Sequence, residues 1–573
     1  MAIHNNEIAS ALERLADLLD IEDANPFRVR AYRNAARTVG GYSRSMADMV
    51  EHGEDLSKLP EIGKDLADKI KTMVETGKLP VLNEAESRTP PALSDLMKIE
   101  GLGPKRVKIL YQHLDIHSLE DLKRAANKGK IRELEGFGKK TEAMIKQRVE
   151  RYSGAEKRTK LLVAQEVASA LIKYLKRSQG VKQITVAGSY RRRKETVGDL
   201  DILVSAKKGS TVMTRFVNYE EIIEVISQGK TRSTVRLQSG LQVDVRVVPQ
   251  VSYGAALHYF TGAKAHNIAV RKLGVKQGYK INEYGVFEDD KRIAGKTEAE
   301  VYQAVGLPYI EPELRENRGE IEAARKGKLP QLITQDELCG DLHAHTKASD
   351  GHHSLRQMAE AAAQLGYQYL AITEHSHRVT VANGLDKTRV LKHIKEIDKL
   401  NAQLDDIQLL KSIEVDIMED GSLDLPDDVL AQLDLTVCSV HYKFNLSRTQ
   451  QTERILKAMD NPHFNILGHP SGRLINEREP YDVDLERLMQ GAKERGCFVE
   501  LNAHPDRLDL TDDACLLAKE IGLKVAISTD AHSTNDLDFM HFGIGQARRG
   551  WLTADDVINT RPLNQLKRLL RRD

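Results

Sequence analysis

The spacing of apolar residues changes along the chain and predicts different kinds of domain in turn. Near the start, a helical stripe is formed by Ile8, Leu12, Leu15, Leu18 and Leu19. Between residues 151 and 250 helical patterns alternate with strand patterns, and after residue 336 short apolar runs are separated by helical patterns such as 355–365 and 485–495. We therefore expect helical domains, then a mixed α/β domain, then a distorted β/α barrel with its site at the carboxyl ends of the strands.

Three short loops in the helical part repeat one pattern, a glycine just before a new helix. They are Leu59-Pro60-Glu61-Ile62-Gly63-Lys64, Ile99-Glu100-Gly101-Leu102-Gly103-Pro104-Lys105 and Leu134-Glu135-Gly136-Phe137-Gly138-Lys139-Lys140. Unpaired amides at a helix amino terminus bind phosphate without regard to base sequence. A single copy is equally well explained by glycines that only cap a tight turn. Three copies followed by lysine favour DNA binding through Gly63, Gly101, Gly103, Lys105, Gly136, Gly138 and Lys139, and they resemble helix-hairpin-helix motifs.

A candidate phosphate site follows in the mixed segment. The apolar residues 184–187 predict a strand that ends at Gly188, where the absence of a side chain before Ser189 lets backbone amides approach an anion closely. The basic residues 191–194 add positive charge beside these amides. The pattern therefore predicts a site for a phosphate group.

Three aspartates on neighbouring strands are the candidate metal ligands of this segment. Gly198 opens a strand on which Asp199 and Asp201 point to the same face, and Asp244 alternates with apolar residues in 242–248, as on an adjacent strand. Any one of them alone is most often an ordinary strand-end residue. Together they predict a cage for two divalent ions about 4 Å apart.

These residues resemble the nucleotidyltransferase palm of the family X DNA polymerases, of which polymerase beta is the best-known member. Tyr259-Phe260-Thr261-Gly262 matches the family's nucleotide-site motif, and Asn267 and Arg271 have the spacing of residues that face the incoming and templating bases. The resemblance implies two Mg²⁺ ions on Asp199, Asp201 and Asp244, and nucleotide contacts by Gly188, Ser189, Arg192, Tyr259, Phe260, Gly262, Asn267 and Arg271. The sequence departs from the family pattern at two positions. Gln242 stands where polymerase beta has an arginine, and Arg193 replaces a glycine beside the triphosphate. Neither change removes a metal ligand, so they bear on rate and fidelity and not on the type of reaction.

The first helices also resemble the amino-terminal domain of polymerase beta, which grips the 5′ phosphate at a gap. Lys69 stands where the family's deoxyribose-phosphate lyase has its Schiff-base lysine, which makes it a candidate catalytic residue. Such a lysine must lose its proton before it attacks a sugar, and Asp65, one turn earlier, opposes that loss. A plain helix-surface lysine is therefore the alternative.

A second constellation lies at the ends of the apolar runs beyond residue 336. Its members are His343, His345, Asp350, His375, Glu414, His441, His469, Asp530 and His532. One histidine at a strand end is usually structural, but this mixture of imidazoles and carboxylates is enough for a cluster of several ions. The set resembles the polymerase and histidinol phosphatase (PHP) domain with every ligand position filled. The resemblance implies Mn²⁺ or Zn²⁺, an activated water and phosphoester hydrolysis, as in a 3′-5′ exonuclease or AP endonuclease.

The balance of charged residues also changes close to residue 330, shortly before the second constellation begins. The 573 residues carry a formal net charge of +1. Residues 1–330 hold 57 Lys and Arg against 45 Asp and Glu, whereas residues 331–573 hold 28 against 39. This asymmetry suggests a nucleic-acid-binding module joined to a metal-binding one. No apolar run approaches the length needed to span a membrane, and residues 1–7 lack the basic-then-apolar pattern of a signal peptide, so we expect a cytoplasmic, nucleoid-associated monomer.

Together these patterns predict a multidomain α+β and α/β protein. The expected domains are a helical lyase-like domain at 1–85, helix-hairpin-helix fingers at 86–150, the palm at 151–250, the thumb at 251–318, a linker at 319–335 and the PHP domain at 336–573. We expect a DNA polymerase that fills short gaps in base excision repair, with gapped or damaged DNA and deoxynucleoside triphosphates as partners. The alternatives are a template-independent nucleotidyltransferase, and a PHP domain that is only a structural or binding module.

Overall fold

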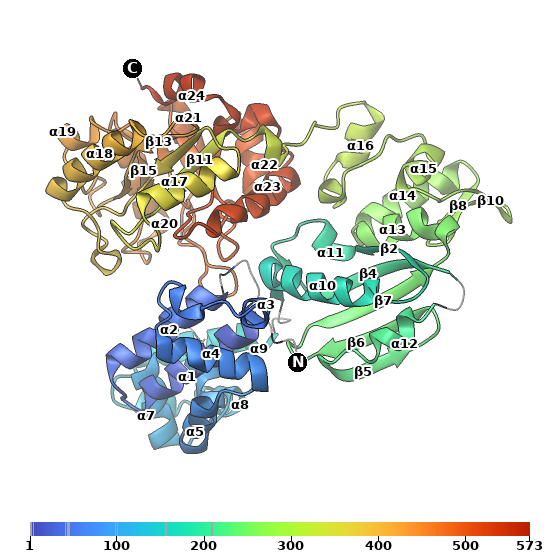
Figure 1. Ribbon diagram of the computed structural model, residues 1–573, viewed down its shortest axis with the longest axis horizontal. Helices are drawn as coiled ribbons and strands as arrows, with labels where there is room; N and C mark the ends of the chain where they lie inside the picture. Colours follow the sequence, from blue (N-terminus) through green and yellow to red (C-terminus); the bar gives the residue numbers. More distant parts are fainter. Residues whose placement is uncertain are drawn as a thin grey trace. The chain divides into compact units, whose positions relative to one another are not determined.

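The computed structural model describes residues 3, 5–40, 42, 46–97, 99, 101–154, 158–207 and 210–572 (Figure 1). Glu100 of the second repeat lies outside these residues. The chain forms two compact units, one of Met1–Thr159, Asn218–Val225 and Val235–Leu241, the other of Lys160–Val217, Ile226–Thr234 and Gln242–Asp573. None of the helices described is both long and apolar enough to cross a membrane.

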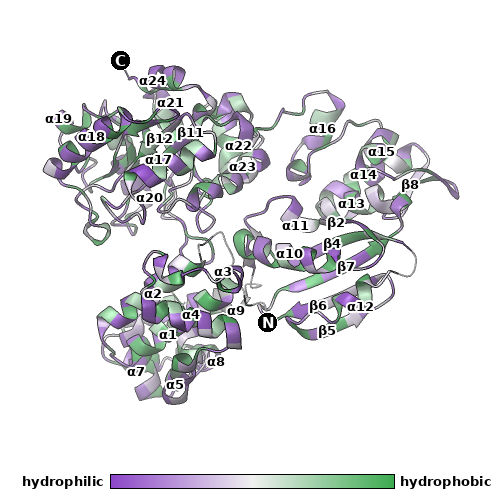
Figure 2. Ribbon diagram, viewed as in Figure 1, coloured by the Kyte–Doolittle hydropathy of each residue, from purple (hydrophilic) through white to green (hydrophobic). Residues whose placement is uncertain are grey.

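The amino-terminal part of the first unit is helical. Its helices are α1 (Asn5–Ile21), α2 (Pro26–Gly40), α3 (Met46–Glu51), α4 (Lys64–Thr76), α5 (Pro80–Arg88), α6 (Ala92–Met97), α7 (Pro104–Leu114), α8 (Leu119–Asn127) and α9 (Lys139–Gly154). Hydrophobic and hydrophilic residues alternate along them (Figure 2). One apolar core includes the buried Leu15 and Tyr32, and a separate core includes Leu110 and Ile145.

The palm is built on a five-stranded sheet with the order β2-β4-β7-β6-β5. Its strands are β2 (Val181–Val186), β4 (Asp199–Ala206), β5 (Ile222–Gln228), β6 (Arg232–Leu237) and β7 (Gln242–Val248), and β1 (Thr159–Lys160) pairs separately with β3 (Thr196–Val197). Its helices are α10 (Leu161–Lys176), α11 (Gly188–Arg191) and α12 (Val212–Phe216). Strand β2 is antiparallel to β4, and β4 is parallel to β7. The parallel pairing brings the carboxylate-bearing ends of β4 and β7 together.

The thumb combines helices with a small antiparallel sheet. It contains α13 (Tyr253–Thr261), α14 (Lys264–Lys276), β8 (Tyr279–Asn282), β9 (Gly285–Glu288), β10 (Lys291–Ala294) and α15 (Glu298–Ala304). The connection expected at 319–335 contains α16 (Glu320–Arg325). Its Ala324 and Leu332 pack into the thumb core, and the fully buried Glu320 accepts a hydrogen bond from His266 at 2.6 Å. The connection is therefore anchored on the thumb.

The last part of the chain is a closed parallel barrel. Its strands are β11 (Gly340–Ala344), β12 (Tyr369–Ile372), β13 (Gln408–Lys411), β14 (Glu414–Asp416), β15 (Val437–Ser439), β16 (Ile466–Leu467), β17 (Phe498–Asn502) and β18 (Val525–Ser528). Single bridges join the sheet β11-β12-β13 to the sheet β14-β15-β16-β17-β18. Ala344 of β11 pairs with Ala531, just after β18, and His375, just after β12, pairs with Glu414 of β14. The surrounding helices are α17 (Leu355–Gln364), α18 (Lys387–Asn401), α19 (Asp427–Leu430), α20 (Arg448–Met459), α21 (Leu485–Glu494), α22 (Asp512–Ile521), α23 (Met540–Arg549) and α24 (Leu563–Leu570).

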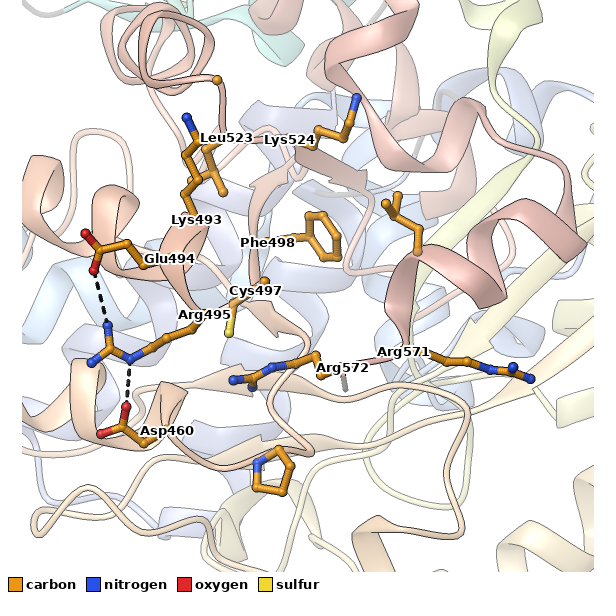
Figure 3. Close-up of a pocket in the computed structure, with 14 residues that line it drawn as sticks. Asp460, Lys493, Glu494, Arg495, Cys497, Phe498, Leu523, Lys524, Arg571 and Arg572 are labelled. Atoms are coloured by element: carbon orange, nitrogen blue, oxygen red, sulfur yellow. Dashed lines mark hydrogen bonds and ion pairs between the residues drawn. The ribbon is translucent and has the colours of Figure 1, made fainter.

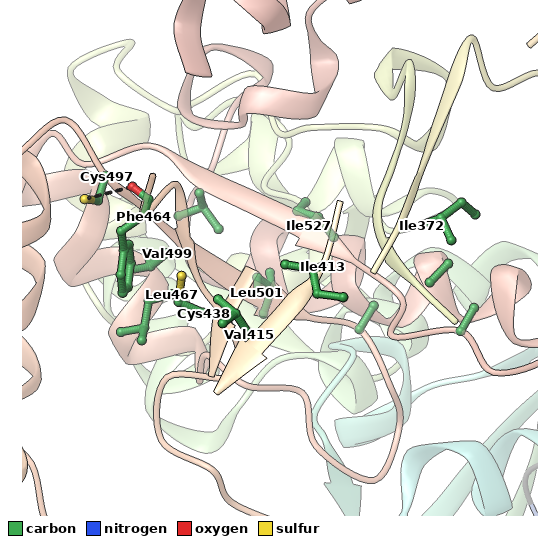
Figure 4. Close-up of a cluster of buried hydrophobic side chains, with 14 of the residues drawn as sticks. Ile372, Ile413, Val415, Cys438, Phe464, Leu467, Cys497, Val499, Leu501 and Ile527 are labelled. Atoms are coloured by element: carbon green, nitrogen blue, oxygen red, sulfur yellow. Dashed lines mark hydrogen bonds between the residues drawn. The ribbon is translucent and has the colours of Figure 1, made fainter. Parts of the chain in front are cut away.

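Alternate residues of the barrel strands enter two apolar clusters. Val499 and Leu501 belong to the larger cluster (Figure 4). This cluster also contains residues of the surrounding helices. Phe498 belongs to the other, together with Leu566 and Leu570 of α24. Because side chains alternate across a strand, the polar residues of β17 after Phe498 share its face. One end of the barrel is thus filled by apolar residues, and the carboxyl end is left for polar side chains.

Candidate active sites

The palm aspartates lie on the two central strands of the sheet. Asp201 of β4 is the register partner of Asp244 of β7, and Asp199 is the partner of Gln242. Gly188 has φ +61°, and a Cβ at this position would lie 2.8 Å from Oδ2 of Asp201. Glycine is therefore needed here both for the backbone conformation and for the close approach to a carboxylate.

The electrostatics of this group favour a cation. Burial, followed by the negative charges of Asp199 and Asp244, raises the pKa of Asp201 to about 7. Asp244 accepts hydrogen bonds from Thr234 at 2.7 Å and Arg232 at 3.0 Å. A divalent ion would relieve the repulsion between the carboxylates, so the donor set fits the two-ion site that the sequence predicts.

Gln242, which stands where polymerase beta has an arginine, retains a donor. Its Nε2 donates to Oδ2 of Asp244 at 3.1 Å. Within the described part of the chain, sets of three ligand atoms within 4.8 Å of one another occur in the barrel and not in the palm. Strand register places Asp201 opposite Asp244, and hydrogen bonds from neighbouring side chains hold the Asp244 carboxylate.

The basic residues beside Gly188 and Ser189 are held by acidic partners. Arg191 forms an ion pair with Glu298 at 2.7 Å, and Nε of Arg192 donates to Glu316 at 2.9 Å. Arg193 has φ +57°, in the left-handed region that glycine adopts most easily. This conformation is consistent with the glycine that the polymerase beta family has at the position. The loop conformation is therefore compatible with the family pattern despite the substitution.

The predicted nucleotide-site motif forms the end of α13 and the turn to α14. Asn267 donates to the carbonyl oxygens of Tyr259 at 2.7 Å and Gly262 at 3.1 Å, and a Cβ on Gly262 would lie 2.5 Å from Oδ1 of Asn267. Arg246 lies over the ring of Phe260 at 4.2 Å. Arg271, one turn after Asn267, is exposed. Asn267 thus fixes the turn, and Arg271 extends from the same helix face.

The three glycine loops have one backbone geometry. Gly101 and Gly136 have φ +89° and +81°, and Glu61 takes the same place in the first repeat with φ +57°. The next residues, Ile62, Leu102 and Phe137, are all buried. Gly63 and Gly103 cap α4 and α7 with no side-chain hydrogen bond to the first helical amides. Gly138 precedes Lys139 at the start of α9. The amides of α4 and α7 are therefore available to an anion.

Lys69 lies on α4 and forms an ion pair with Asp65. The contact is one that a plain helix-surface lysine makes with a carboxylate one turn earlier. Lyase chemistry at Lys69 therefore stays a prediction.

The barrel gathers all the predicted ligands at the carboxyl ends of its strands. Three sets of ligand atoms each lie within 4.8 Å: His345, Asp350, His375 and His532; His343, His345 and Asp530; His375, Glu414 and His441. His469 joins them through Glu414, whose Oε1 lies 2.9 Å from its Nε2. His469 and Asp530 have φ +26° and +56°, the kind of backbone strain that occurs at functional sites.

Several ligand atoms have no hydrogen-bond partner among the described residues although they are buried. They include Nε2 of His343, both ring nitrogens of His345 and Oε2 of Glu414. Buried polar atoms are normally hydrogen-bonded, so ligand atoms that lie close together without such bonds suit cations between them. The residues present fit a metal cluster.

Burial and the charges of neighbouring ligands shift the pKa values of histidines in the cluster. Burial lowers the pKa of His375, but the charge of Glu414 outweighs it and raises that pKa to about 10. Burial and the positive charges of His532 and His375 lower the pKa of His345 to about 4. Neighbouring imidazoles are thus driven to different protonation states, as expected where cations and carboxylates are crowded.

Sequence reasoning missed residues that hold the ligands in place. Glu500, fully buried on β17, lies 2.7 Å from Nδ1 of His343 and accepts from the backbone N–H of His469 at 2.6 Å. Asn502, on the same strand face, donates to Asp530 at 3.1 Å. A carboxylate in an otherwise apolar strand was the available signal for Glu500. Partners of this kind orient imidazole ligands and raise their basicity.

A cavity of about 610 Å³ lies elsewhere on the barrel (Figure 3). Phe498, the first residue of β17, and Lys524, just before β18, line it. It therefore opens at the amino ends of these strands, away from the metal ligands.

The chain matches protein-family models along most of its length. They are a helix-hairpin-helix domain at 3–79, a SAM-like helix-hairpin-helix tandem at 93–151, the DNA polymerase beta palm at 162–250, the DNA polymerase beta thumb at 256–316 and the PHP domain at 341–504. The predicted fold class is confirmed by these matches, whereas the residue boundaries of the domains and the roles of single residues stay predictions.

Relatives of known name match the whole chain or one part of it. The DNA polymerase/3'-5' exonuclease PolX of Bacillus subtilis is 37% identical over 100% of both chains. A probable phosphatase of Thermoanaerobacter sp. is 30% identical over 39% of this chain and 91% of its own, and DNA polymerase lambda of Arabidopsis thaliana is 29% identical over 46% and 54%. The resemblance expected from the sequence is therefore confirmed. The chain belongs to the family X DNA polymerases that carry a carboxy-terminal PHP domain.

Proposed function

We propose that this protein is a DNA-directed DNA polymerase that fills short gaps during repair and also hydrolyses DNA from the 3′ end at its barrel site. The observation that carries the proposal is the parallel register that sets Asp201 opposite Asp244, directly beside the Gly188 turn. The converging ligands of the barrel support the second activity.

In the palm, Asp199, Asp201 and Asp244 would hold two Mg²⁺ ions, which lower the pKa of the primer 3′ hydroxyl and neutralise the triphosphate. Ser189 and Arg192 bind the triphosphate. Thr234, Arg232 and Gln242 orient Asp244 through the hydrogen bonds already described.

In the barrel, the nine predicted ligands would hold a cluster of Mn²⁺ or Zn²⁺ ions, which supplies an activated water and stabilises the negative charge of phosphodiester hydrolysis. Glu500 orients the ring of His343, and Asn502 orients the carboxylate of Asp530. These contacts limit the rotation of the ligands before any ion binds. Cleavage at abasic sites is a further use of the same site.

The substrate we propose is a gap of one or a few nucleotides with a 5′ phosphate, which would place the protein at the nucleoid in the cytoplasm. The basic residues 1–330 and the three glycine loops provide phosphate contacts on both sides of such a gap. A monomer offers all of these groups. The repeated DNA-binding loops favour a duplex substrate over template-independent transfer. The complete set of predicted ligands favours a catalytic barrel over a merely structural one.

The test uses a gapped duplex with a labelled primer, incubated with Mg²⁺ or Mn²⁺, with and without nucleotides. We expect extension with nucleotides and Mg²⁺, shortening with Mn²⁺ alone, and weaker binding to nicked and intact duplexes. Equal extension of single-stranded primer would favour the template-independent alternative. Absence of shortening with metal bound would favour a structural barrel.

A further inference from the structure

A buried arginine of the barrel reaches the phosphate loop of the palm. Arg549, at the end of α23, has a side chain that is only 3% exposed. Its Nη1 donates to the backbone carbonyl of Arg192 at 2.9 Å and to Oε1 of Glu316 at 2.9 Å. Its Nη2 donates to Asp512 at 2.6 Å. One side chain thus links the loop, the end of the thumb and the barrel.

Arg192 shares the same carboxylate oxygen. Its Nε donates to Oε1 of Glu316 at 2.9 Å, and its Nη1 donates to the carbonyl of Thr261 at 2.8 Å. Two fixed bonds from one planar guanidinium define its plane. Its Nη2 bonds to none of the residues the structure describes, so one edge of the guanidinium stays available.

Arg549 supplies positive charge to both carboxylates of this network, with Lys194 beside Glu316 and Arg318 paired with Asp512. Burial raises the pKa of Glu316, and the charges of Arg192 and Arg549 outweigh it, so that its pKa lies below the ordinary value. Asp512 in turn pairs with both Arg549 and Arg318. Without Arg549, Glu316 would keep Arg192 as its hydrogen-bonded cationic partner, with Lys194 nearby, and would compete with a triphosphate for Arg192.

We propose that Arg549 is a positioning residue for the nucleotide site: it holds Glu316 and the Arg192 carbonyl, so that the free edge of the Arg192 guanidinium faces the triphosphate of the incoming nucleotide. The inference rests on the proposed polymerase function. The barrel would then contribute to nucleotide binding in the palm as well as to hydrolysis.

Neighbouring contacts show that the loop and the barrel meet at more than one point. A Cβ on Gly545 of α23 would lie 3.2 Å from Cβ of Arg193, and Arg473 forms an ion pair with Glu195 at 2.6 Å. Arg548, next to Arg549, pairs with Glu313 at 2.8 Å and donates to the carbonyl of Ile333. Arg548 lies at the same boundary but touches neither Arg192 nor Glu316, which makes it a matched control.

The experiment measures single-nucleotide insertion into a gapped duplex by the full chain, with KM for the nucleotide and kcat determined separately. We expect Arg549→Ala to raise KM on the order of 10-fold with kcat within about 2-fold of the wild type, because the misplaced group acts in binding. Arg549→Lys keeps the charge but cannot make all three contacts, so it should raise KM by a smaller factor. Arg548→Ala should leave KM unchanged.

A double variant decides whether Arg549 acts through Arg192. In an Arg192→Ala background, Arg549→Ala should cause no further rise in KM. Equal factors in both backgrounds, or an unchanged KM in Arg549→Ala, would overturn the inference. If Arg549→Ala fails to fold, an unchanged KM in Arg549→Lys has the same force. A wild-type protein that inserts no nucleotide would instead overturn the proposed function.

Discussion

Replacing Gly188 by alanine should damage catalysis far more than stability. The added Cβ would lie 2.8 Å from Oδ2 of Asp201, closer than real Cβ atoms approach, so the carboxylate must move by some tenths of an ångström. Because Oδ2 is the end of a side chain, this movement costs little folding energy. It nevertheless displaces Asp201, which we propose as a metal ligand, from its position opposite Asp244.

The backbone strain can be separated from the clash. Alanine at φ +61° costs about 1–2 kcal/mol. Gly240 provides the matched control, since it has φ +82° and no atom within 4 Å of an added Cβ. Gly188→Ala and Gly240→Ala should therefore lose similar amounts of stability in urea unfolding, whereas only Gly188→Ala should lose activity.

The assay is primer extension on a gapped duplex at saturating Mg²⁺. We expect kcat to fall by about 10-fold to 10²-fold in Gly188→Ala, because a misplacement of about 1 Å costs on the order of 10²-fold and the shift here is smaller. In Gly240→Ala it should stay within about 2-fold of the wild type. Equal losses in the two variants, or normal extension by Gly188→Ala, would refute the proposed role of the turn.

Three further substitutions test the sites. Asp244→Asn should reduce extension on the order of 10³-fold, measured at saturating nucleotide, because a ligand charge is lost; near-normal extension would remove the palm assignment. Glu500→Gln should weaken metal binding to the barrel by about 10–100-fold in a metal titration, since His343 loses its orienting carboxylate; unchanged affinity would show that the contact is dispensable. Burial raises the pKa of Glu298, but Arg191 and Arg315 outweigh it and lower that pKa to about 2. This stabilisation is present above the unfolded-state pKa near 4.5 and is lost as pH falls through about 2. Glu298→Gln should therefore destabilise the thumb by about 3 kcal/mol at pH 7 and by less below pH 4. Hydrogen exchange of the amides of α15 measures this loss. A loss of stability that does not depend on pH would contradict the reasoning.

The sequence predicted the elements and ligand residues that local patterns encode. Strand alternation placed Asp199 and Asp201 on one face, and the repeated glycines marked the loops before α4, α7 and α9. Most of the nine predicted barrel ligands could be proposed because they end apolar runs, and Asp350 follows on a loop. In each case a few neighbouring residues contain the whole signal.

Long-range partners could not be found in this way. Glu500 meets His343 across 157 residues, and Arg549 meets Arg192 across 357. No local pattern in a single sequence links such pairs, because the fold alone brings them together. The anchoring of 319–335 on the thumb was missed for the same reason, since His266 supplies the partner of Glu320.

The most direct test of two separate active sites compares two double variants on one gapped, labelled duplex. His343→Ala with His345→Ala should abolish Mn²⁺-dependent shortening and leave Mg²⁺-dependent extension intact. Asp199→Ala with Asp201→Ala should abolish extension and leave shortening intact, because the two ligand sets share no residue. If the palm variant bound DNA normally yet failed to shorten the primer, the two sites would not be independent and the account would be contradicted.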